Sequence, residues 1–156
     1  MIVKLSQLNR LRKSLKNKRV VFVGGSFDMF HRGHLEYLKK CRNFGDVLVV
    51  AIATDRRIKQ RKGEQRPIIS QKDRLKIIDS VSCIDYCLIA PEKKKDNSVP
   101  AIVIMNYLKP DIFVTTDKRW KLFRDEVEGI GVEMRVIERN RRDSTTRIIS
   151  RILKQI

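Results

Sequence analysis

Short runs rich in valine and isoleucine alternate with amphipathic stretches along this chain, and the alternation limits the folds open to it. Strands separated by helices are typical of right-handed crossover units, which build a parallel sheet covered on both faces. We predict strands at 20–24, 47–53, 85–89, 111–115 and 132–137. We predict helices at 33–44, 71–81, 99–108 and 120–128, and a last helix from Ser144. The expected fold is α/β, a doubly wound Rossmann-like domain with a five-stranded parallel sheet and helices on both faces.

Residues 1–18 precede the first predicted strand and indicate an amphipathic helix. Leucines recur three and four residues apart between Leu5 and Leu15, which places them on one stripe. The stripe fits packing on the rest of the domain, or a helix lying on a membrane surface. It lacks the unbroken apolar run of a signal peptide or a membrane span. We expect residues 1–156 to form a single domain.

Composition excludes some classes of protein and leaves others open. The chain has 35 Lys and Arg against 18 Asp and Glu, a net charge of +17, which attracts polyanions and small phosphorylated ligands alike. Its three cysteines, Cys41, Cys83 and Cys87, argue against a disulfide framework and favour a reducing, cytoplasmic compartment. Both histidines lie in one short segment, so no zinc site is predicted.

Basic, hydroxyl and imidazole side chains follow four of the five predicted strands. Ligands of doubly wound sheets bind outside the carboxyl ends of the strands, where these segments would converge. The segments are 24–34, 54–67, 116–120 and 138–147. We therefore predict a pocket for a polyphosphate at this edge of the sheet.

The segment after the first strand carries the most specific signal. A helix that begins near Gly33 offers unpaired N–H groups and the positive end of its dipole to an anion. His31 and His34 stand three apart across that helix start, so both can face one phosphate and donate hydrogen bonds as charge builds in a transition state. The segment is neither a Rossmann dinucleotide fingerprint nor a P-loop. A structural or metal-binding histidine pair is the plainer alternative, and it leaves the glycines and basic segments unexplained.

Two motifs resemble the cytidylyltransferase-like nucleotidyltransferase superfamily. The sequence GSFD at 25–28 leads into HRGH at 31–34, which matches the His-x-Gly-His hallmark after the first strand. The sequence STT at 144–146 is similar to the Ser/Thr-rich start of the family's last helix. The resemblance extends over essentially the whole chain and implies a nucleotidyltransferase.

Residues 59–67, with Arg74 following, look most like the adenylyltransferase domain of the bifunctional heptose-phosphate enzymes. That resemblance implies ATP and a sugar 1-phosphate, such as a heptose phosphate. Glycerol-3-phosphate cytidylyltransferases are similar in placing an arginine five residues before the serine of the final motif, as Arg139 stands before Ser144. Archaeal FAD synthases share the same framework. The residues at 115–116 and 141–143 depart from all three groups, so the base and the acceptor stay open.

In the implied reaction, an anionic phosphate oxygen of the acceptor attacks the α-phosphorus of a nucleoside triphosphate, and pyrophosphate leaves with Mg²⁺. No general base is needed, so the protein's task is to orient the reactants and neutralise charge. The predicted catalytic residues are His31, His34 and Lys62. The predicted nucleotide-binding residues are Ser26, Phe27, His31, Gly33, His34, Asp117, Arg139, Ser144, Thr145 and Thr146. The predicted acceptor-binding residues are Lys59, Arg61, Lys62 and Arg66.

Each assignment has a simpler alternative. Residues 59–62 can be a solvated basic loop, and Ser144 can be an ordinary helix N-cap. Trp120 can stack on a nucleobase but fits a packing role better, and Cys41 fits a small core residue better than a nucleophile. No protein metal site is predicted beyond the Mg²⁺ that accompanies the nucleotide, and relatives are often homodimers. The alternative from another class is a basic nucleic-acid-binding domain, although the aromatic residues form no exposed stacking series.

Overall fold

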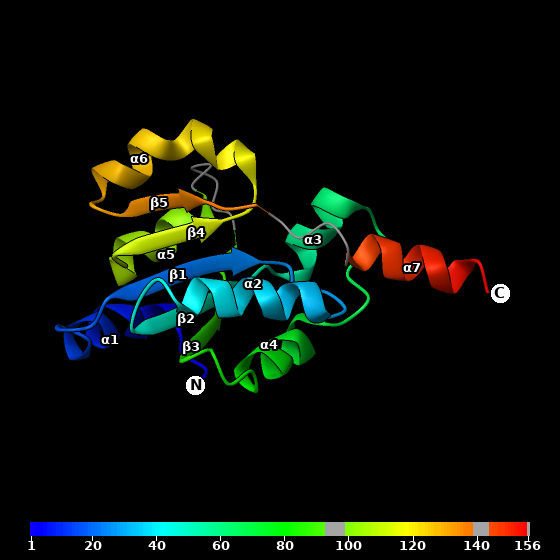
Figure 1. Cartoon of the computed structure of the whole chain (residues 1–156), viewed down its shortest axis with the longest axis horizontal. Coiled ribbons are helices and arrows are strands. Elements are labelled where there is room, and N and C mark those ends of the chain that lie inside the picture. Colours follow the sequence, from blue (N-terminus) through cyan, green and yellow to red (C-terminus); the bar gives the residue numbers. More distant parts are fainter. Residues whose placement is uncertain (93–98, 139–143, 156) are drawn as a thin grey trace.

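The computed structural model describes residues 1–92, 99–138 and 144–155. In these ranges five parallel strands form one sheet, in the order β3-β2-β1-β4-β5 (Figure 1). The strands are β1 (Val20–Gly25), β2 (Val47–Ile52), β3 (Tyr86–Ile89), β4 (Ile112–Thr115) and β5 (Glu133–Val136). Strand order reverses between β1 and β4, and this confirms the predicted Rossmann-like, doubly wound fold.

Helices cover both faces of the sheet. The 3₁₀ helices are η1 (Leu5–Gln7) and η2 (Lys118–Phe123). The α-helices are α1 (Leu8–Ser14), α2 (Arg32–Arg42), α3 (Asp55–Lys62), α4 (Gln71–Asp79), α5 (Pro100–Leu108), α6 (Arg124–Gly129) and α7 (Thr145–Leu153). In Figure 1, α2 and α4 lie in front of the sheet and α1 and α5 lie behind it, while α7 projects away from the body.

Alternate residues of the central strands enter different hydrophobic cores, because successive side chains of a strand point to opposite faces. From β1, Val20 and Phe22 enter the core that also holds Leu8 of α1 and Ile104 of α5. The core on the other face holds Val21 and Val23 of β1, Leu38 of α2 and Ile78 of α4. Burial on both faces explains why these strands are runs of apolar residues rather than alternating patterns.

Most predicted elements agree with the structure to within one or two residues, and helix α3 is the main difference. No helix was predicted over residues 54–63, yet Thr54 caps a helix by accepting the N–H of Arg57 at 3.3 Å. Only Ile58 of this helix is buried, so the segment has no apolar stripe to reveal a helical period. The predicted helix at 1–18 is also shorter, because Ile2 pairs with Cys87 alongside β3.

Candidate active site

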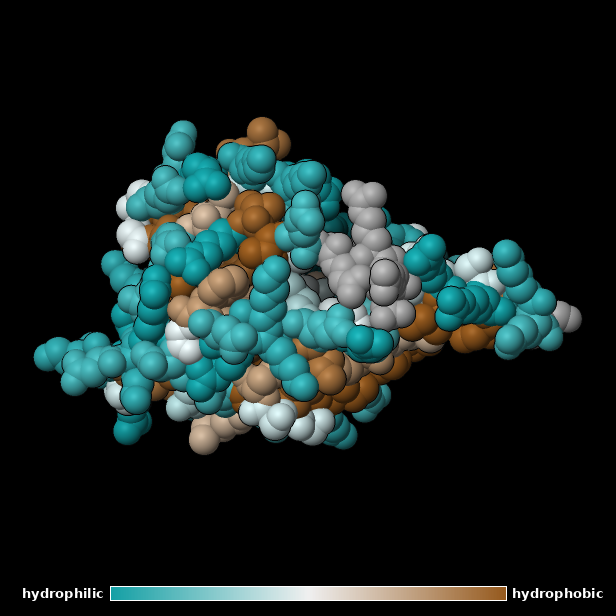
Figure 2. All heavy atoms as spheres, in the orientation of Figure 1, coloured by the Kyte–Doolittle hydropathy of each residue, from teal (hydrophilic) through white to brown (hydrophobic). Residues whose placement is uncertain are grey.

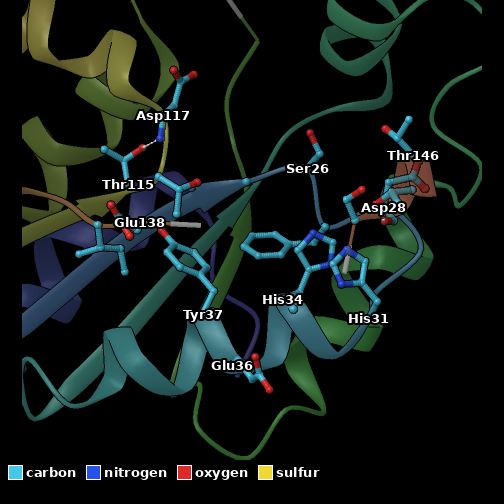
Figure 3. A pocket seen from close by; sticks show the side chains of 18 of the residues that line it. Ser26, Asp28, His31, His34, Glu36, Tyr37, Thr115, Asp117, Glu138 and Thr146 are labelled. Atoms are coloured by element: carbon cyan, nitrogen blue, oxygen red, sulfur yellow. Dashed lines mark hydrogen bonds between the residues drawn. The ribbon is translucent and has the colours of Figure 1, made fainter. Parts of the chain in front are cut away.

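A cavity of about 740 Å³ opens at the carboxyl ends of β1 and β4, where the strand order reverses. Figure 3 shows Ser26, Asp28 and both histidines on one side of it, and Thr115, Asp117 and Glu138 on the other. Its size falls within the range of small-molecule sites. The predicted residues that line it are Ser26, Phe27, His31, Gly33, His34, Arg61, Lys62, Asp117, Ser144, Thr145 and Thr146. Lys59 and Arg66 are outside the described lining, and Arg139 lies outside the described residues.

The two histidines form one rigid unit at the start of α2. His31 is the N-cap residue with an extended backbone, and its carbonyl accepts the N–H of His34 at 2.9 Å. Their rings stack with centroids 3.9 Å apart. The ring of Phe27 meets the edge of His34, and the ring of Phe30 stacks on it. Aromatic contacts therefore fix both imidazoles at the cavity wall, beside the positive end of the helix dipole.

The turn between β1 and α2 has a strained backbone. Phe27 and Met29 have φ of 48° and 49°, in the left-handed region that residues other than glycine rarely adopt. A Cβ on Gly25 would lie 2.7 Å from the ring of Phe27, so this position requires glycine. Such a conformation persists only where neighbouring structure holds it in place.

Asp28 is one of the groups that hold this turn. Its carboxylate is buried and accepts the N–H groups of Ile68 at 3.1 Å and Ile69 at 3.0 Å, and Nε of Arg66 at 2.8 Å. Burial acts to raise the pKa of Asp28, but these hydrogen bonds and the Arg66 charge outweigh burial and lower the pKa. The structure thus places Arg66 on Asp28 instead of in the cavity lining, with its side chain only 12% exposed.

Arg74 also supports the turn, from a fully buried position in α4. Its guanidinium donates to the carbonyls of Ser26, of Ala53 at 2.8 Å and of Ile69 at 2.9 Å. It also forms an ion pair of 2.7 Å with the carboxylate of Asp55, which is the first residue of α3. One side chain therefore connects the turn after β1, the start of α3 and the segment before α4.

Helix α3 and the segment after β4 bring charges to the opposite rim. Arg61 and Lys62 line the cavity, whereas the ammonium of Lys59 lies 3.6 Å from the carboxylate of Glu64. Asp117 accepts from Nε and Nη2 of Arg119 at 2.9 and 2.6 Å, and hydrogen bonding from Arg119 is the main cause of its lowered pKa. Its carboxylate is thus held ionised, 4.0 Å from Arg61.

The hydroxyl groups at the start of α7 have different roles. Ser144 is an N-cap, because its Oγ accepts the N–H of Arg147 at 3.2 Å. Thr145 is buried, and its Oγ1 donates to the carbonyl of Asp28 at 2.9 Å. Thr146 is exposed at the cavity. The start of α7 is therefore tied to the strained turn and faces the cavity.

Trp120 and Cys41 both have packing roles. The ring of Trp120 meets Phe113 at 4.6 Å and Phe123 at 5.5 Å between centroids, although Trp120 also lines the cavity. Cys41 is buried in α2, and burial raises the pKa of its thiol to about 12. A thiol with that pKa stays protonated at neutral pH and is a poor nucleophile.

Residues 22–151 match the family described as Cytidylyltransferase-like. The chain belongs to the cytidylyltransferase-like family. The match covers most of the chain, so it confirms the predicted family and supports the predicted class of enzyme, a nucleotidyltransferase.

Relatives of this cytidylyltransferase-like chain include two longer proteins, each named Bifunctional protein HldE. The Helicobacter pylori (strain ATCC 700392 / 26695) protein is 36% identical over 151 residues, which cover 96% of this chain and 31% of that protein. The Syntrophotalea carbinolica protein is 37% identical over 156 residues, which cover 92% of this chain and 31% of that protein. This chain thus spans about a third of the length of these relatives.

Solved structures share the fold. A lipopolysaccharide core biosynthesis protein from Thermoplasma volcanium superposes with a TM-score of 0.62 and 24% identity, over 81% of this chain and all of that one. A pantoate-beta-alanine ligase from Francisella tularensis superposes with a TM-score of 0.68 and 17% identity, over all of this chain and 78% of that one. At these identities the likeness concerns the fold alone.

Sequence reasoning missed the supporting roles that Arg74, Asp28 and Tyr37 have in this cytidylyltransferase-like site. Arg74 had a recognisable signal, since it stands one helical turn before the buried Ile78 and so places a charge on the apolar stripe of α4. Asp28 was visible only as part of a motif. Tyr37, which lines the cavity and donates to the carbonyl of Val114 at 3.0 Å, had no signal beyond its place in α2.

Proposed function

We propose that this chain transfers AMP from ATP to a sugar 1-phosphate, such as a heptose phosphate, and releases pyrophosphate. The observation that carries the proposal is the convergence of the stacked His31 and His34, the cationic Arg61 and Lys62, and the start of α7 on one cavity. The 36–37% identity to the HldE proteins supports the choice of ATP and a heptose phosphate.

The chemistry needs charge stabilisation rather than an acid or a base. An acceptor phosphate oxygen attacks the α-phosphorus in line and forms a new P–O bond. The bond between the α-phosphorus and the oxygen that bridges it to the β-phosphorus breaks, and pyrophosphate leaves. His31 and His34 donate hydrogen bonds to the α-phosphate, and the positive end of α2 acts in the same direction. Lys62 and Arg61 approach from α3 and neutralise the acceptor phosphate and the transferring group.

The start of α7 is suited to the outer phosphates of ATP. Residues 144–146, at the N-terminus of this helix, line the cavity, and helix N-termini favour phosphate groups. Ser144 can accept the Arg147 N–H and still donate its own hydroxyl hydrogen to a phosphate oxygen.

Mg²⁺ is part of the proposal, but the described residues do not form a built site for it. No group of three or more His, Cys, Asp or Glu side chains in the described ranges is placed to hold a metal ion. In the cavity, Asp28 pairs with Arg66 and Asp117 pairs with Arg119. We therefore expect Mg²⁺ to be bound by the phosphate oxygens of the nucleotide, as is common for this ion.

Pyrophosphate release tests the reaction. The chain is incubated with ATP or CTP and with heptose 1-phosphate, glycerol 3-phosphate or FMN, and His34→Ala serves as the inactive control. We expect release with ATP and heptose 1-phosphate, and a loss of about 100- to 1000-fold in turnover for His34→Ala. Release with CTP and glycerol 3-phosphate alone would reassign both substrates. Salt-sensitive RNA or DNA binding, without release from any acceptor, would instead favour the nucleic-acid-binding alternative.

Assembly and compartment are part of the same proposal. In the described ranges no helix is both long and apolar enough to cross a membrane. We propose a cytoplasmic enzyme made of one nucleotidyltransferase domain over 1–156, and a homodimer as the family resemblance implies. Light scattering of the purified chain measures the oligomeric state.

A further inference from the structure

Helix α7 has an apolar face that stays largely in solvent. Ile152 is 45% exposed and Leu153 is 68% exposed. Ile148 and Ile149, one turn earlier, are partly exposed. The spacing of these four residues places them on one side of the helix, and Figure 1 shows the helix projecting from the body. This face is too apolar to be explained as an ordinary solvated surface.

All the charged residues of α7 and the residues just after it are basic. Arg147, Arg151 and Lys154 are all exposed, and residues 144–155 contain no aspartate or glutamate. A short helix with an apolar stripe and a cationic opposite side has the pattern of helices that lie in the interface of a lipid bilayer.

The apolar surface continues from α7 onto the body of the molecule. Ile68 is 57% exposed, and its N–H donates to the carboxylate of Asp28. Thr145, at the first turn of α7, donates to the carbonyl of the same aspartate. Ile68 therefore lies at the base of the helix, and Figure 2 shows apolar atoms both along α7 and on the body beside it.

Three kinds of partner differ in how they fit this surface. A nucleic acid would pair with the arginines and leave the isoleucines in water. A second copy of the chain would bring another net charge of +17 against the same basic helix. A bilayer containing anionic lipids offers both an apolar interior and a negative surface, so it complements both sides of α7.

We propose that α7, with Ile68 at its base, docks on the surface of a membrane rich in anionic lipids. The helix is already formed and anchored, because Ser144 caps it and Thr145 ties it to Asp28. Binding therefore avoids the entropy cost of folding a disordered segment. Neither the four apolar residues of α7 nor Ile68 is among the described residues that line the cavity. The proposal therefore does not depend on the nucleotidyl transfer proposed above.

Co-sedimentation with vesicles tests the proposal. The full chain is mixed with phosphatidylcholine vesicles that contain 0 or 30% phosphatidylglycerol, at about 50 mM and about 300 mM salt, a range over which surface charges become strongly screened. We expect pelleting only with phosphatidylglycerol, weakened by salt, and a loss of about tenfold or more for the double variant Ile152→Ser/Leu153→Ser. The matched control is Leu122→Ser in η2. It removes a leucine that is 85% exposed but belongs neither to α7 nor to the surface at Ile68.

Three results would overturn the proposal. One is the absence of pelleting with phosphatidylglycerol vesicles at low salt. Another is pelleting that the double variant leaves unchanged, because the helix face would then play no part. The third is a dimer in light scattering that the double variant converts to a monomer, which would assign the face to a second copy. Unchanged pyrophosphate release by the double variant, in the assay above, shows that it is folded.

Discussion

Arg74 and Ser26 are joined by a hydrogen bond that spans 48 positions of sequence, from the buried guanidinium to a backbone carbonyl in the strained turn. The same guanidinium bonds Ala53 and Asp55, which lead into α3. Ser26, Arg61 and Lys62 all line the cavity, so this one side chain links the turn that leads to the histidines with the helix that carries the two cationic residues.

Arg74→Lys should fold but lose activity. Lysine keeps the charge, yet a single ammonium cannot bond three segments as the planar guanidinium does. We expect kcat/KM for ATP to fall about 10- to 100-fold, chiefly as a rise in KM, because the turn at Ser26 and helix α3 are no longer held together. The matched control is Lys76→Met, on the exposed side of the same helix. Steady-state pyrophosphate release measures kcat and KM separately. An unchanged KM would show that Arg74 only stabilises the fold.

Asp28→Asn should change how stability depends on pH. The folded pKa of Asp28 lies below its ordinary value of 3.8, so the carboxylate stabilises the fold fully above pH 3.8 and loses this effect as pH falls through the folded pKa. The variant lacks this titration and leaves the nearly buried Arg66 without its charge partner, which should cost about 3 kcal/mol of unfolding free energy at pH 7.

Urea unfolding of wild type and Asp28→Asn between pH 7 and pH 3 measures this difference. The gap between the two proteins should narrow only below about pH 4, because the unfolded wild-type chain then binds a proton at Asp28 while the folded protein, with its lowered pKa, stays ionised. Asp125→Asn, at an exposed position of α6, should show no gap. A gap that stays constant down to pH 3 would mean that the charge of Asp28 contributes nothing.

The strands were predictable from the sequence because their signal is local. The runs of β1 and β2 are buried along nearly their whole length, so their valines and isoleucines form continuous segments that composition reveals. Helix α3 was not predictable in this way, since Ile58 is its only buried residue and charge dominates the rest. Its single visible signal is Thr54 as a capping residue before Asp55.

The sequence predicted those site residues that come directly after a strand or begin a helix. The histidines, Lys62 and the residues at 144–146 come to one cavity because the fold carries all strand ends to one edge. The pairings between loops were not predictable. Arg66 meets Asp28 across 38 positions and Thr145 meets it across 117, and such partners depend on how the crossovers pack. Arg66 was therefore assigned to the acceptor, although its charge faces Asp28.

Gly25→Ala should disturb the turn that carries the site. The new Cβ would lie 2.7 Å from the ring of Phe27, which is held by its left-handed backbone and by contact with His34. We expect a loss of about 1 to 3 kcal/mol in unfolding free energy, as for other overpacked positions, together with weaker ATP binding. Thermal unfolding and titration calorimetry measure the two effects.

Two further variants separate this clash from a general cost of replacing glycine. Gly129→Ala adds a Cβ with nothing within 4 Å, so it should be neutral or slightly stabilising in α6. Phe27→Leu combined with Gly25→Ala removes the ring that clashes and should recover part of the stability. Equal losses for the two glycine variants would contradict the clash.

His31→Ala and His34→Ala should not have additive effects on turnover. Their rings stack at 3.9 Å and line the same cavity, so loss of either imidazole also releases the other from its position. Each single variant should lower kcat about 100- to 1000-fold, and the double variant should be only slightly slower than the worse single variant. Single-turnover pyrophosphate release provides the four rates of the cycle. Additive losses in the double variant would show that the histidines act on different atoms, independently of their stacking.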